Sequence, residues 1–212
     1  SYVLAQFAMP RANVLVTAQD LFFSAIPAAG AKGLVASFRR GLAPQYEVES
    51  GPDQLTVAGR TFHRLHYGAP LAGLHWRVLS TDVRCHALTF TFTGTDVAAL
   101  DAAEQALSAI SFAPAGPDCV SDYAYVVEKT ELAFTSHRFN TIPVRLLVDR
   151  KARGKHLHLP SALPEQSPAS IAAVRTWRFK PYRRHGKAAA FETGLVFGAQ
   201  PVRNVASGVA PP

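Results

Sequence analysis

The sequence lacks the features that mark several specialised classes of protein. It has only two cysteines among 212 residues, which excludes a disulfide-rich scaffold and a zinc site with four cysteine ligands. No segment reaches about 18 uninterrupted apolar residues, so no transmembrane helix is expected; the apolar stretch 12–31 is broken by Asp20 and Pro27. Hydrophobic residues make up 48% and charged residues 17%, a composition that supports a folded core.

The sequence also lacks the short motifs of common enzyme and cofactor sites, including His-Glu-x-x-His, Gly-x-Ser-x-Gly and Cys-x-x-Cys. Residues 30–33 (Gly-Ala-Lys-Gly) do not have the spacing of a phosphate-binding loop. His156 and His158 would share one face of a strand but have no obvious third ligand, so surface or core histidines are the better interpretation. Carboxylates are sparse and form no evident acid–base pair. We therefore expect no enzymatic activity, no metal and no cofactor.

The formal charge of +7 is unevenly distributed. Residues 1–113 contain eight basic and eight acidic residues, whereas residues 114–212 contain fourteen basic and seven acidic ones. All of the excess therefore lies in the second part, which suggests two domains, one of them facing an anionic partner. The candidates are an acidic protein, an anionic lipid surface and nucleic acid; a solubilising charged surface is the alternative.

Residues 1–113 are expected to form an antiparallel sheet followed by a packing helix. Strands are predicted at 57–67, 74–79 and 82–93, and in the last of these Phe90 and Phe92 alternate with threonines. Thr95 is the predicted N-cap of a helix over 96–111, whose apolar residues have helical spacing. Less regular patterns suggest further helices at 31–40 and starting in 17–20.

Residues 113–117 (Ala-Pro-Ala-Gly-Pro) are typical of a linker, and we place a domain boundary after Ala113. Beyond it, Ser167 and Pro168 predict the N-cap and first residue of a helix ending near Trp177, with Pro181 preventing its extension. Strands are predicted at 123–127, 131–134, 143–150, 156–159 and 188–197. The sequence thus predicts an α+β fold of two small domains, 1–113 and 114–212, each an antiparallel sheet packed by helices, with a flexible tail from about residue 199.

Residues 174–181 (Val-Arg-Thr-Trp-Arg-Phe-Lys-Pro), followed by a Gly-Lys turn at 186–187 and a strand ending at Phe197, resemble the C-terminal domain of the TonB family. The resemblance covers about residues 140–198. It implies a periplasmic module that binds a partner's peptide, often by adding a strand to a sheet edge. In such a module Trp177 and Phe179 are scaffold residues. The sequence shows no membrane anchor and no long Pro/Lys-rich spacer, so a stand-alone interaction module is implied rather than an energy transducer.

Residues 45–113 are similar, in their order of three strands and a helix ending in Ile-Ser-Phe at 110–112, to PsbP-like α/β domains. That group includes extrinsic subunits of photosynthetic complexes and many exported proteins. The similarity implies a second hypothesis, an extrinsic subunit of a membrane-bound electron-transfer or photosynthetic complex.

Basic residues alternate with aromatic residues between 175 and 187. If the aromatic residues belong to the scaffold, the charges form an exposed hairpin that faces an acidic protein or anionic lipid heads. Binding of single-stranded nucleic acid by stacking and phosphate contacts is the weaker alternative. The candidate partner-binding residues are Arg178, Lys180, Arg183, Arg184 and Lys187.

The two cysteines, Cys85 and Cys119, could form a disulfide in an oxidising compartment or remain two buried thiols. The chain begins with Ser1 and shows no signal sequence, which fits an exported chain whose signal peptide was removed, or a chain from which a tag was cleaved. We therefore predict a non-enzymatic, periplasmic or otherwise extracytoplasmic interaction protein, whose partner is a protein of a membrane-associated complex. A small hydrolase or a ligand-binding protein with an unrecognised site is the alternative.

Overall fold

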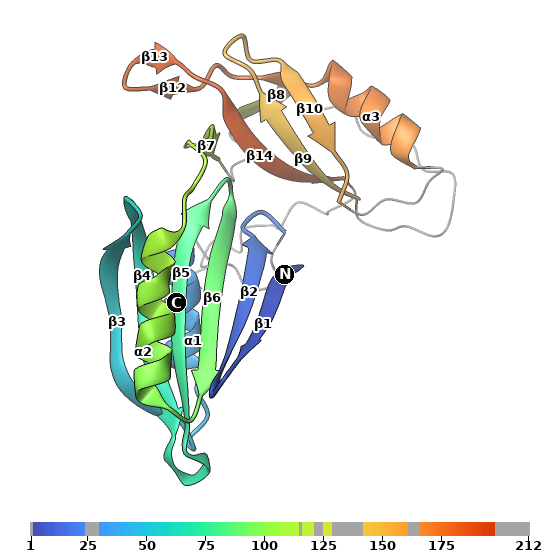
Figure 1. Cartoon of the computed structure of the whole chain (residues 1–212). Helices are drawn as coiled ribbons and strands as arrows, with labels where there is room; N and C mark the ends of the chain where they lie inside the picture. Colours follow the sequence, from blue (N-terminus) through green and yellow to red (C-terminus); the bar gives the residue numbers. More distant parts are fainter. Residues whose placement is uncertain are drawn as a thin grey trace, which may run out of the picture. The chain divides into compact units, whose positions relative to one another are not determined.

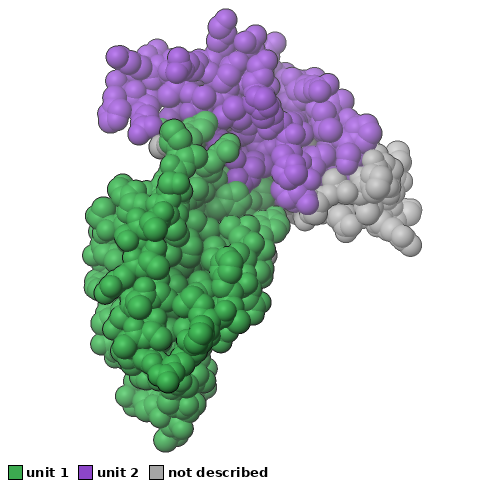
Figure 2. All heavy atoms as spheres, in the orientation of Figure 1, with its two compact units in different colours: residues 1–118 green, residues 119–212 purple. Residues whose placement is uncertain are grey.

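The computed structural model describes residues 2–23, 30–114, 116–120, 125–128, 142–160 and 166–197. Strands and helices are mixed within the chain, which is the predicted α+β class. The chain divides into two compact units, residues 1–118 (unit 1) and 119–212 (unit 2), coloured separately in Figure 2. Unit 1 therefore extends past Ala113, after which the sequence placed the boundary.

Unit 1 is built on one six-stranded antiparallel sheet in the order β1-β2-β6-β5-β4-β3 (Figure 1). Helix α1 (Ala31–Arg40) joins β2 to β3, and helix α2 (Val97–Gln105) follows β6 and continues as a 3-10 helix. The two helices cover opposite faces of the sheet (Figure 1). The strands are β1 (Tyr2–Met9), β2 (Ala12–Asp20), β3 (Glu47–Val57), β4 (Arg60–Ala69), β5 (Leu74–Val83) and β6 (His86–Gly94), and the 3-10 helices are Pro70–Ala72 and Ala106–Ala109.

The main apolar core of unit 1 lies between the sheet and α2. Phe90 and Phe92 occupy alternate positions of β6 and are both buried there, which confirms the predicted alternation of this strand. On the other face, α1 buries one side of its surface. The α2 core also contains Ala12, Val14, Val16, Phe62, Leu79, Leu100, Ala103 and Leu107, and the residues that α1 buries are Ala31, Leu34 and Val35.

Two tight turns divide segments that the sequence predicted as single strands. Residues 58–59 both have positive φ and turn the chain between β3 and β4, inside the strand predicted over 57–67. Residues 84–85 do the same between β5 and β6, inside the strand predicted over 82–93. Both predictions were wrong there because non-glycine residues rarely adopt a positive φ, so Ala58, Arg84 and Cys85 gave no turn signal.

The predicted helix starts in unit 1 also needed correction. Residues 17–20, where a short helix was predicted to begin, belong to β2 and pair with β6 along their whole length. Asp96 rather than Thr95 caps α2, because its side chain accepts a hydrogen bond from the backbone N–H of Ala99 at 3.1 Å. Pairing with β6 makes residues 17–20 a strand rather than a helix start, and the hydrogen bond from Ala99 makes Asp96 the cap rather than its neighbour Thr95.

Helix α1 has the bounds that the sequence predicted, but its N-terminus is capped from a distant strand. The backbone N–H of Ala31 donates a 2.7 Å hydrogen bond to the side chain of Asp82 in β5. Gly30 precedes it with a φ of 113°, and a Cβ at this position would lie 2.9 Å from an Asp82 carboxylate oxygen. Glycine is therefore required both by the backbone conformation and by the close approach of β5.

Unit 2 contains a four-stranded sheet in the order β10-β9-β14-β7 and two smaller pairs, β11 with β8 and β12 with β13. Helix α3 (Ser167–Thr176) connects β10 to β11. The strands are β7 (Asp118–Cys119), β8 (Val126–Glu128), β9 (Ile142–Val148), β10 (Gly154–His158), β11 (Arg178–Phe179), β12 (Arg183–Arg184), β13 (Lys187–Ala188) and β14 (Phe191–Phe197). The strand predicted over 131–134 and the tail from 199 lie outside the described residues.

The core of unit 2 contains residues of α3 and of strands β9, β11 and β14. Strand β9 buries every second residue, and all four of its core side chains are fully buried. Trp177 is 4% exposed and its ring centroid lies 6.5 Å from that of Phe179. The predicted burial of these two aromatic residues is therefore confirmed. The same core includes Ile142, Val144, Leu146, Val148, Ala173, Val174, Phe191 and Leu195.

Strand pairing, not proline, ends helix α3. Trp177 has an extended backbone with ψ of 144°, and the two residues after it pair with β8. Pro181, which the sequence predicted as the helix stop, lies beyond this point. At the other end Gln166 occupies the N-cap position, so Ser167 is the first helical residue rather than the cap.

Replacing Trp177 with alanine should remove the largest side chain of this core. We expect Trp177→Ala to lower the free energy of unfolding by about 3–5 kcal/mol, because a buried aromatic residue leaves a cavity. Val127→Ala is a suitable control, since Val127 of β8 is 60% exposed and should change stability little. Urea unfolding monitored by the circular dichroism of the backbone measures the stability of both variants. Equal effects of the two substitutions would contradict the assigned core.

Candidate functional sites

The five basic residues selected from the sequence all lie on the exposed surface of unit 2. Arg178 is in β11 and Lys180 follows it, while Arg183, Arg184 and Lys187 lie on the β12–β13 hairpin. The hairpin turn is residues 185–186, both with positive φ, which is the conformation of two-residue hairpin turns. Arg183 donates a 2.8 Å hydrogen bond to the backbone oxygen of Gly186, which holds the turn closed.

The hairpin places like charges side by side. Arg184 lies opposite Lys187 in the β12–β13 register, an arrangement that destabilises an antiparallel pair. Arg178 forms an exposed 3.2 Å ion pair with Glu128. Among the described residues, no carboxylate lies within ion-pair distance of Lys180 or Lys187. An anionic partner would therefore relieve repulsion within the hairpin as well as gain contacts of its own.

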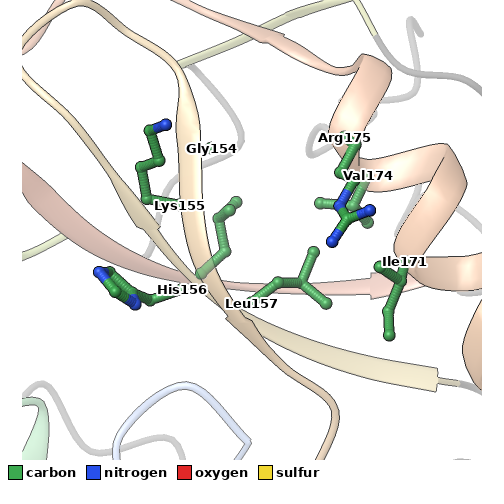
Figure 3. Close-up of a pocket in the computed structure, with 8 residues that line it drawn as sticks. Gly154, Lys155, His156, Leu157, Ile171, Val174 and Arg175 are labelled. Carbon is green, nitrogen blue, oxygen red and sulfur yellow. The ribbon is translucent and has the colours of Figure 1, made fainter.

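A groove of about 520 Å³ lies between α3 and β10 of unit 2. Apolar side chains from both elements line it: Leu146 and Val174 are buried at its base, and Leu157 and Ile171 face the space from strand and helix (Figure 3). Gly154 lets β10 approach β9, because a Cβ there would lie 2.9 Å from a side-chain carbon of Leu146. The groove is thus an apolar channel that runs beside a strand.

Basic groups border this groove, and the strand beside it has an open edge. Lys155 and Arg175 are exposed, and the guanidinium of Arg175 extends from α3 toward the strand (Figure 3). Strand β10 is at the edge of its sheet, and no strand of the described residues pairs with its outer side. Within the described part of unit 2, its backbone N–H and C=O groups on that side thus have no strand partner, and groups of this kind can pair with an added strand.

The two histidines of β10 do not form a metal site with other described residues. His156 has a φ of 41° and lies in a register irregularity between Lys155 and His158, so the strand alternation that would align both histidines is interrupted. Both side chains are exposed, which agrees with the surface interpretation. The described part of the chain holds no group of three His, Cys, Asp or Glu residues able to bind a metal ion.

Both cysteines are disulfide-bonded, which resolves the two alternatives that the sequence left open. Cys85 is almost fully buried and lies in the β5–β6 turn, not within a strand as predicted. Cys119 is the second residue of β7. Disulfides persist in oxidising compartments and are rare in the cytosol.

Removing the disulfide should destabilise the folded chain. We expect the double variant Cys85→Ala/Cys119→Ser to be less stable by about 3–4 kcal/mol, because the bond restricts the unfolded chain. The same loss should appear when a reductant is added to the wild type, measured as a fall in thermal midpoint. The variant is its own control, since reductant should leave its midpoint unchanged.

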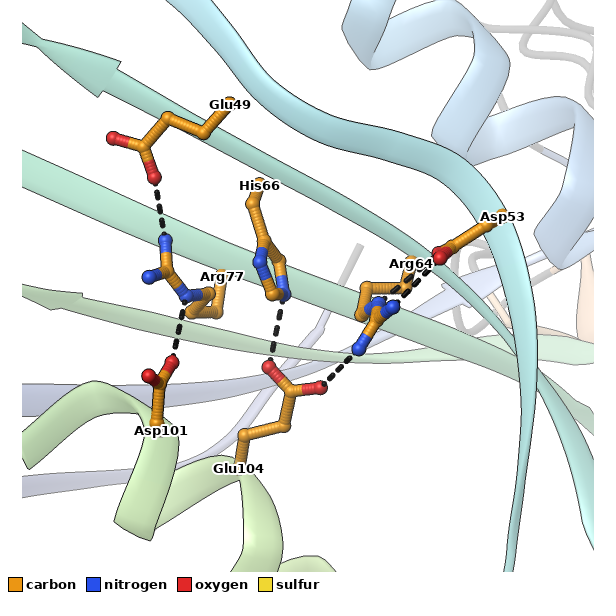
Figure 4. A network of polar contacts seen from close by, with 7 residues as sticks. All are labelled: Glu49, Asp53, Arg64, His66, Arg77, Asp101 and Glu104. Carbon is orange, nitrogen blue, oxygen red and sulfur yellow. Dashed lines mark hydrogen bonds and ion pairs between the residues drawn. The ribbon is translucent and has the colours of Figure 1, made fainter. Parts of the chain in front are cut away.

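Unit 1 contains a charged network that the sequence did not reveal (Figure 4). It connects strands β3, β4 and β5 to helix α2 through side chains that lie far apart in the sequence. Its members are Glu49, Asp53, Arg64, His66, Arg77, Asp101 and Glu104. The available signal was spacing: Arg64 and His66 share one face of a strand, and Asp101 and Glu104 one face of a helix.

Glu104 is the centre of this network. Its carboxylate accepts a 3.1 Å hydrogen bond from Arg64 Nη1 and lies 2.9 Å from His66 Nε2. Arg64 also donates two hydrogen bonds, at 3.0 and 2.6 Å, to the carboxylate of Asp53. Such a two-point contact between guanidinium and carboxylate fixes the orientation of both groups. One arginine therefore ties β3 and β4 to α2.

A second arginine makes a parallel link. Arg77 of β5 is buried and donates to Glu49 at 2.7 Å and, more weakly, to Asp101 at 3.4 Å. Glu49 also contacts the imidazole of His75 at 2.5 Å. The buried cation is thus neutralised from both β3 and α2, which is the condition for burying a charge without a large penalty.

These contacts lower the pKa values of Asp53 and Glu104 and so favour their ionised forms. Arg64 lowers the pKa of Asp53, chiefly through its hydrogen bonds, against an opposing effect of burial. Burial by itself would raise the pKa of Glu104, but hydrogen bonds from His66 and Arg64 outweigh it and lower the pKa below its ordinary value. The pKa of Arg64 is raised, mainly by its hydrogen bonds to Asp53.

A groove of about 550 Å³ opens beside the network, between the end of β3 and helix α2. Its lining includes apolar Leu55 and Val57 and the polar groups of His66, Asp101 and Glu104. The His66–Glu104 pair orients the imidazole, as a carboxylate does for a histidine base. Because the charged groups of the network pair with one another, the geometry favours a structural role for the network. A small-ligand site in the adjacent groove is the second interpretation.

No protein-family model matches this sequence, and no curated protein matches it significantly. No helix in the described part of the chain has the length and hydrophobicity needed to cross a membrane. The geometry of the individual surfaces is therefore the basis for any functional conclusion.

Removing the central carboxylate should weaken unit 1 in a pH-dependent way. We expect Glu104→Gln to lower the free energy of unfolding by about 1–3 kcal/mol at neutral pH, because Arg64 and His66 lose a charged partner. Folding lowers the pKa of Glu104, so its ionised form stabilises the fold above the ordinary value of 4.5, and this contribution is lost as pH falls below that value.

The difference in stability between wild type and Glu104→Gln should therefore shrink between about pH 5 and pH 3. Asp101→Asn is the matched control on the same helix face, since its side chain is half exposed and its contact to Arg77 is long, 3.4 Å. Urea unfolding at several pH values measures both variants. A difference that stays constant across this pH range would contradict the assigned role of Glu104.

Proposed function

We propose that this chain is a non-enzymatic interaction protein of the cell envelope, in which unit 2 binds an extended peptide segment of a partner protein. The observation that carries the proposal is the edge strand β10 beside the apolar groove under α3. An added strand would pair with the backbone of β10 and insert an apolar side chain over Leu157 and Ile171. This is the mode of recognition that the resemblance to the TonB C-terminal domain implies.

Charge specifies the peptide further. Lys155 and Arg175 flank the groove, and the exposed β12–β13 hairpin adds further positive charge to the same unit. The complementary partner is an apolar segment flanked by acidic residues, because rim charges of opposite sign favour encounter and orientation. The disulfide-bonded cysteines support an extracytoplasmic location. A partner within a membrane-associated complex fits both the location and the excess positive charge.

Two alternatives have some support from unit 1. The order β4, β5, β6 and α2 is the order on which the similarity to PsbP-like domains rests, and it supports an extrinsic subunit of a membrane complex. The groove with His66 and Glu104 instead supports binding of a small polar ligand. Ligand-induced chemical-shift changes confined to β3, β4 and α2 would favour the second alternative.

Two synthetic peptides test the proposed function on the full chain. Both have the same alternating valine–threonine centre; one has aspartates at both ends and the other has lysines. We expect the acidic peptide to shift the NMR signals of β10 and α3. The lysine peptide should bind about tenfold more weakly, since each exposed ion pair contributes about 0.2–1 kcal/mol.

A charge reversal at the groove provides the control. Arg175→Glu should remove the preference for the acidic peptide, whereas Arg39→Glu, the same change at an exposed position of α1, should leave it intact. Equal binding of the two peptides, or signal changes located away from β10 and α3, would show that this edge is not the binding site.

A further inference from the structure

The edge strand β1 of unit 1 exposes an uncharged, apolar surface. Every residue of β1 except Ala5 is exposed, and the strand (Tyr-Val-Leu-Ala-Gln-Phe-Ala-Met) contains no charge and no proline. Val3 is 67% exposed, Leu4 58% and Phe7 55%. A strand of this kind at the edge of a sheet favours pairing with another strand.

The helices of unit 1 leave β1 without cover. Helix α1 packs mainly on β3 to β6, and α2 mainly on β5 and β6. Among the described residues, no strand pairs with the outer side of β1. Both the backbone edge and the apolar side chains of the strand are therefore open within the part of the chain that the structure describes.

The opposite edge of the same sheet is protected. Strand β3 carries Glu47, Glu49 and Asp53, and it contains Pro52, which has no backbone N–H. Charges and proline on an edge strand discourage pairing with other chains. This sheet thus has one edge with charges and proline, which resist strand addition, and one edge with neither; the only irregularity of β1 in its pairing with β2 lies between Val3 and Ala5.

We infer that β1 is a homodimer interface, at which the β1 strands of two chains pair antiparallel and join two six-stranded sheets. The inference is independent of the peptide site on unit 2. A second copy fits because the occupant must itself be an uncharged apolar strand, and β1 supplies one. Pairing β1 with its counterpart sets no charges opposite one another, whereas a charged strand would bury its charge against apolar side chains.

The pairing of β1 with β2 shows which β1 residues share a face, and a symmetric β1–β1 register is possible on that face. Ala5, Phe7 and Met9 pair with core-facing residues of β2 and so lie on one face of the sheet. A two-fold axis perpendicular to the sheet at Phe7 places Phe7 opposite its counterpart and Ala5 opposite Met9 of the second chain. The dimer centre is then an aromatic pair, one of the more stabilising cross-strand pairs.

Sedimentation equilibrium of the full chain over a range of concentrations tests the inference. We expect a mass of twice the chain's 22.8 kDa, and the mass of one chain for Phe7→Lys. Val48→Lys is the matched control, because Val48, like Phe7, is an exposed apolar residue of an edge strand; it is 42% exposed and lies on the protected strand β3. It should remain dimeric. Circular dichroism and thermal unfolding verify that each variant is folded.

A second variant tests the register without depending on a destabilising charge. Phe7→Cys should give a disulfide-linked dimer on a non-reducing gel, since directly opposite Cα atoms in an antiparallel pair lie about 4.5–5.5 Å apart, within disulfide range. Val48→Cys should not. A wild type with the mass of one chain at all concentrations, or a Phe7→Lys variant that stays dimeric, would overturn the inference. A single-chain mass with binding of a foreign strand at β1 would do so as well.

Discussion

An edge strand leaves half of its backbone hydrogen-bonding groups without a partner in its own sheet. Both of the interactions proposed for this chain, one on each unit, depend on this property. Among the described residues of unit 2, β10 is an edge strand beside an apolar groove with basic borders. Among those of unit 1, β1 is an edge strand that is apolar and uncharged. Backbone groups pair with any strand, so the neighbouring side chains must select the partner. In the two proposed interactions, the basic borders of the groove would select an acidic peptide, and the uncharged strand would select one like itself.

The two units use their charges differently. In unit 1 basic and acidic residues are equal in number up to residue 113, and its buried charges pair within the network around Arg64, Arg77 and Glu104. These pairs hold the strands to α2 and leave little charge for a partner. In unit 2 most of the described basic residues lie on exposed positions, including a hairpin where Arg184 lies opposite Lys187. Like charges directly opposite each other destabilise an antiparallel pair, and a bound anion would reduce this repulsion.

Buried aromatic residues give unit 2 its rigid support for these surfaces. Trp177 and Phe179 are inside the core, so the basic residues between and after them point outward from a fixed backbone. Arg178 and Lys180 alternate with the buried aromatics because successive residues of an extended segment face opposite sides. The mixture of cations and aromatic rings that suggested nucleic-acid stacking is therefore divided between surface and core, and Trp177 and Phe179 present no stacking surface.

The sequence by itself determined the elements whose side chains alternate or recur regularly: the part of β6 with Phe90 and Phe92, β9, helix α3, and the burial of Trp177. A less regular pattern also suggested helix α1. Local periodicity is enough there because each pattern has one face to bury. Only the tertiary structure decided the turns at Ala58 and Cys85, the capping of α1 by Asp82, and the network around Glu104. The turns place non-glycine residues at a positive φ, for which the sequence gives no local signal. The cap and the network depend on contacts between residues far apart in the chain, and no local pattern records which distant side chain will form them. The exposed edge of β1 was hidden for the same reason, since an apolar strand has the same sequence whether or not a neighbour covers it.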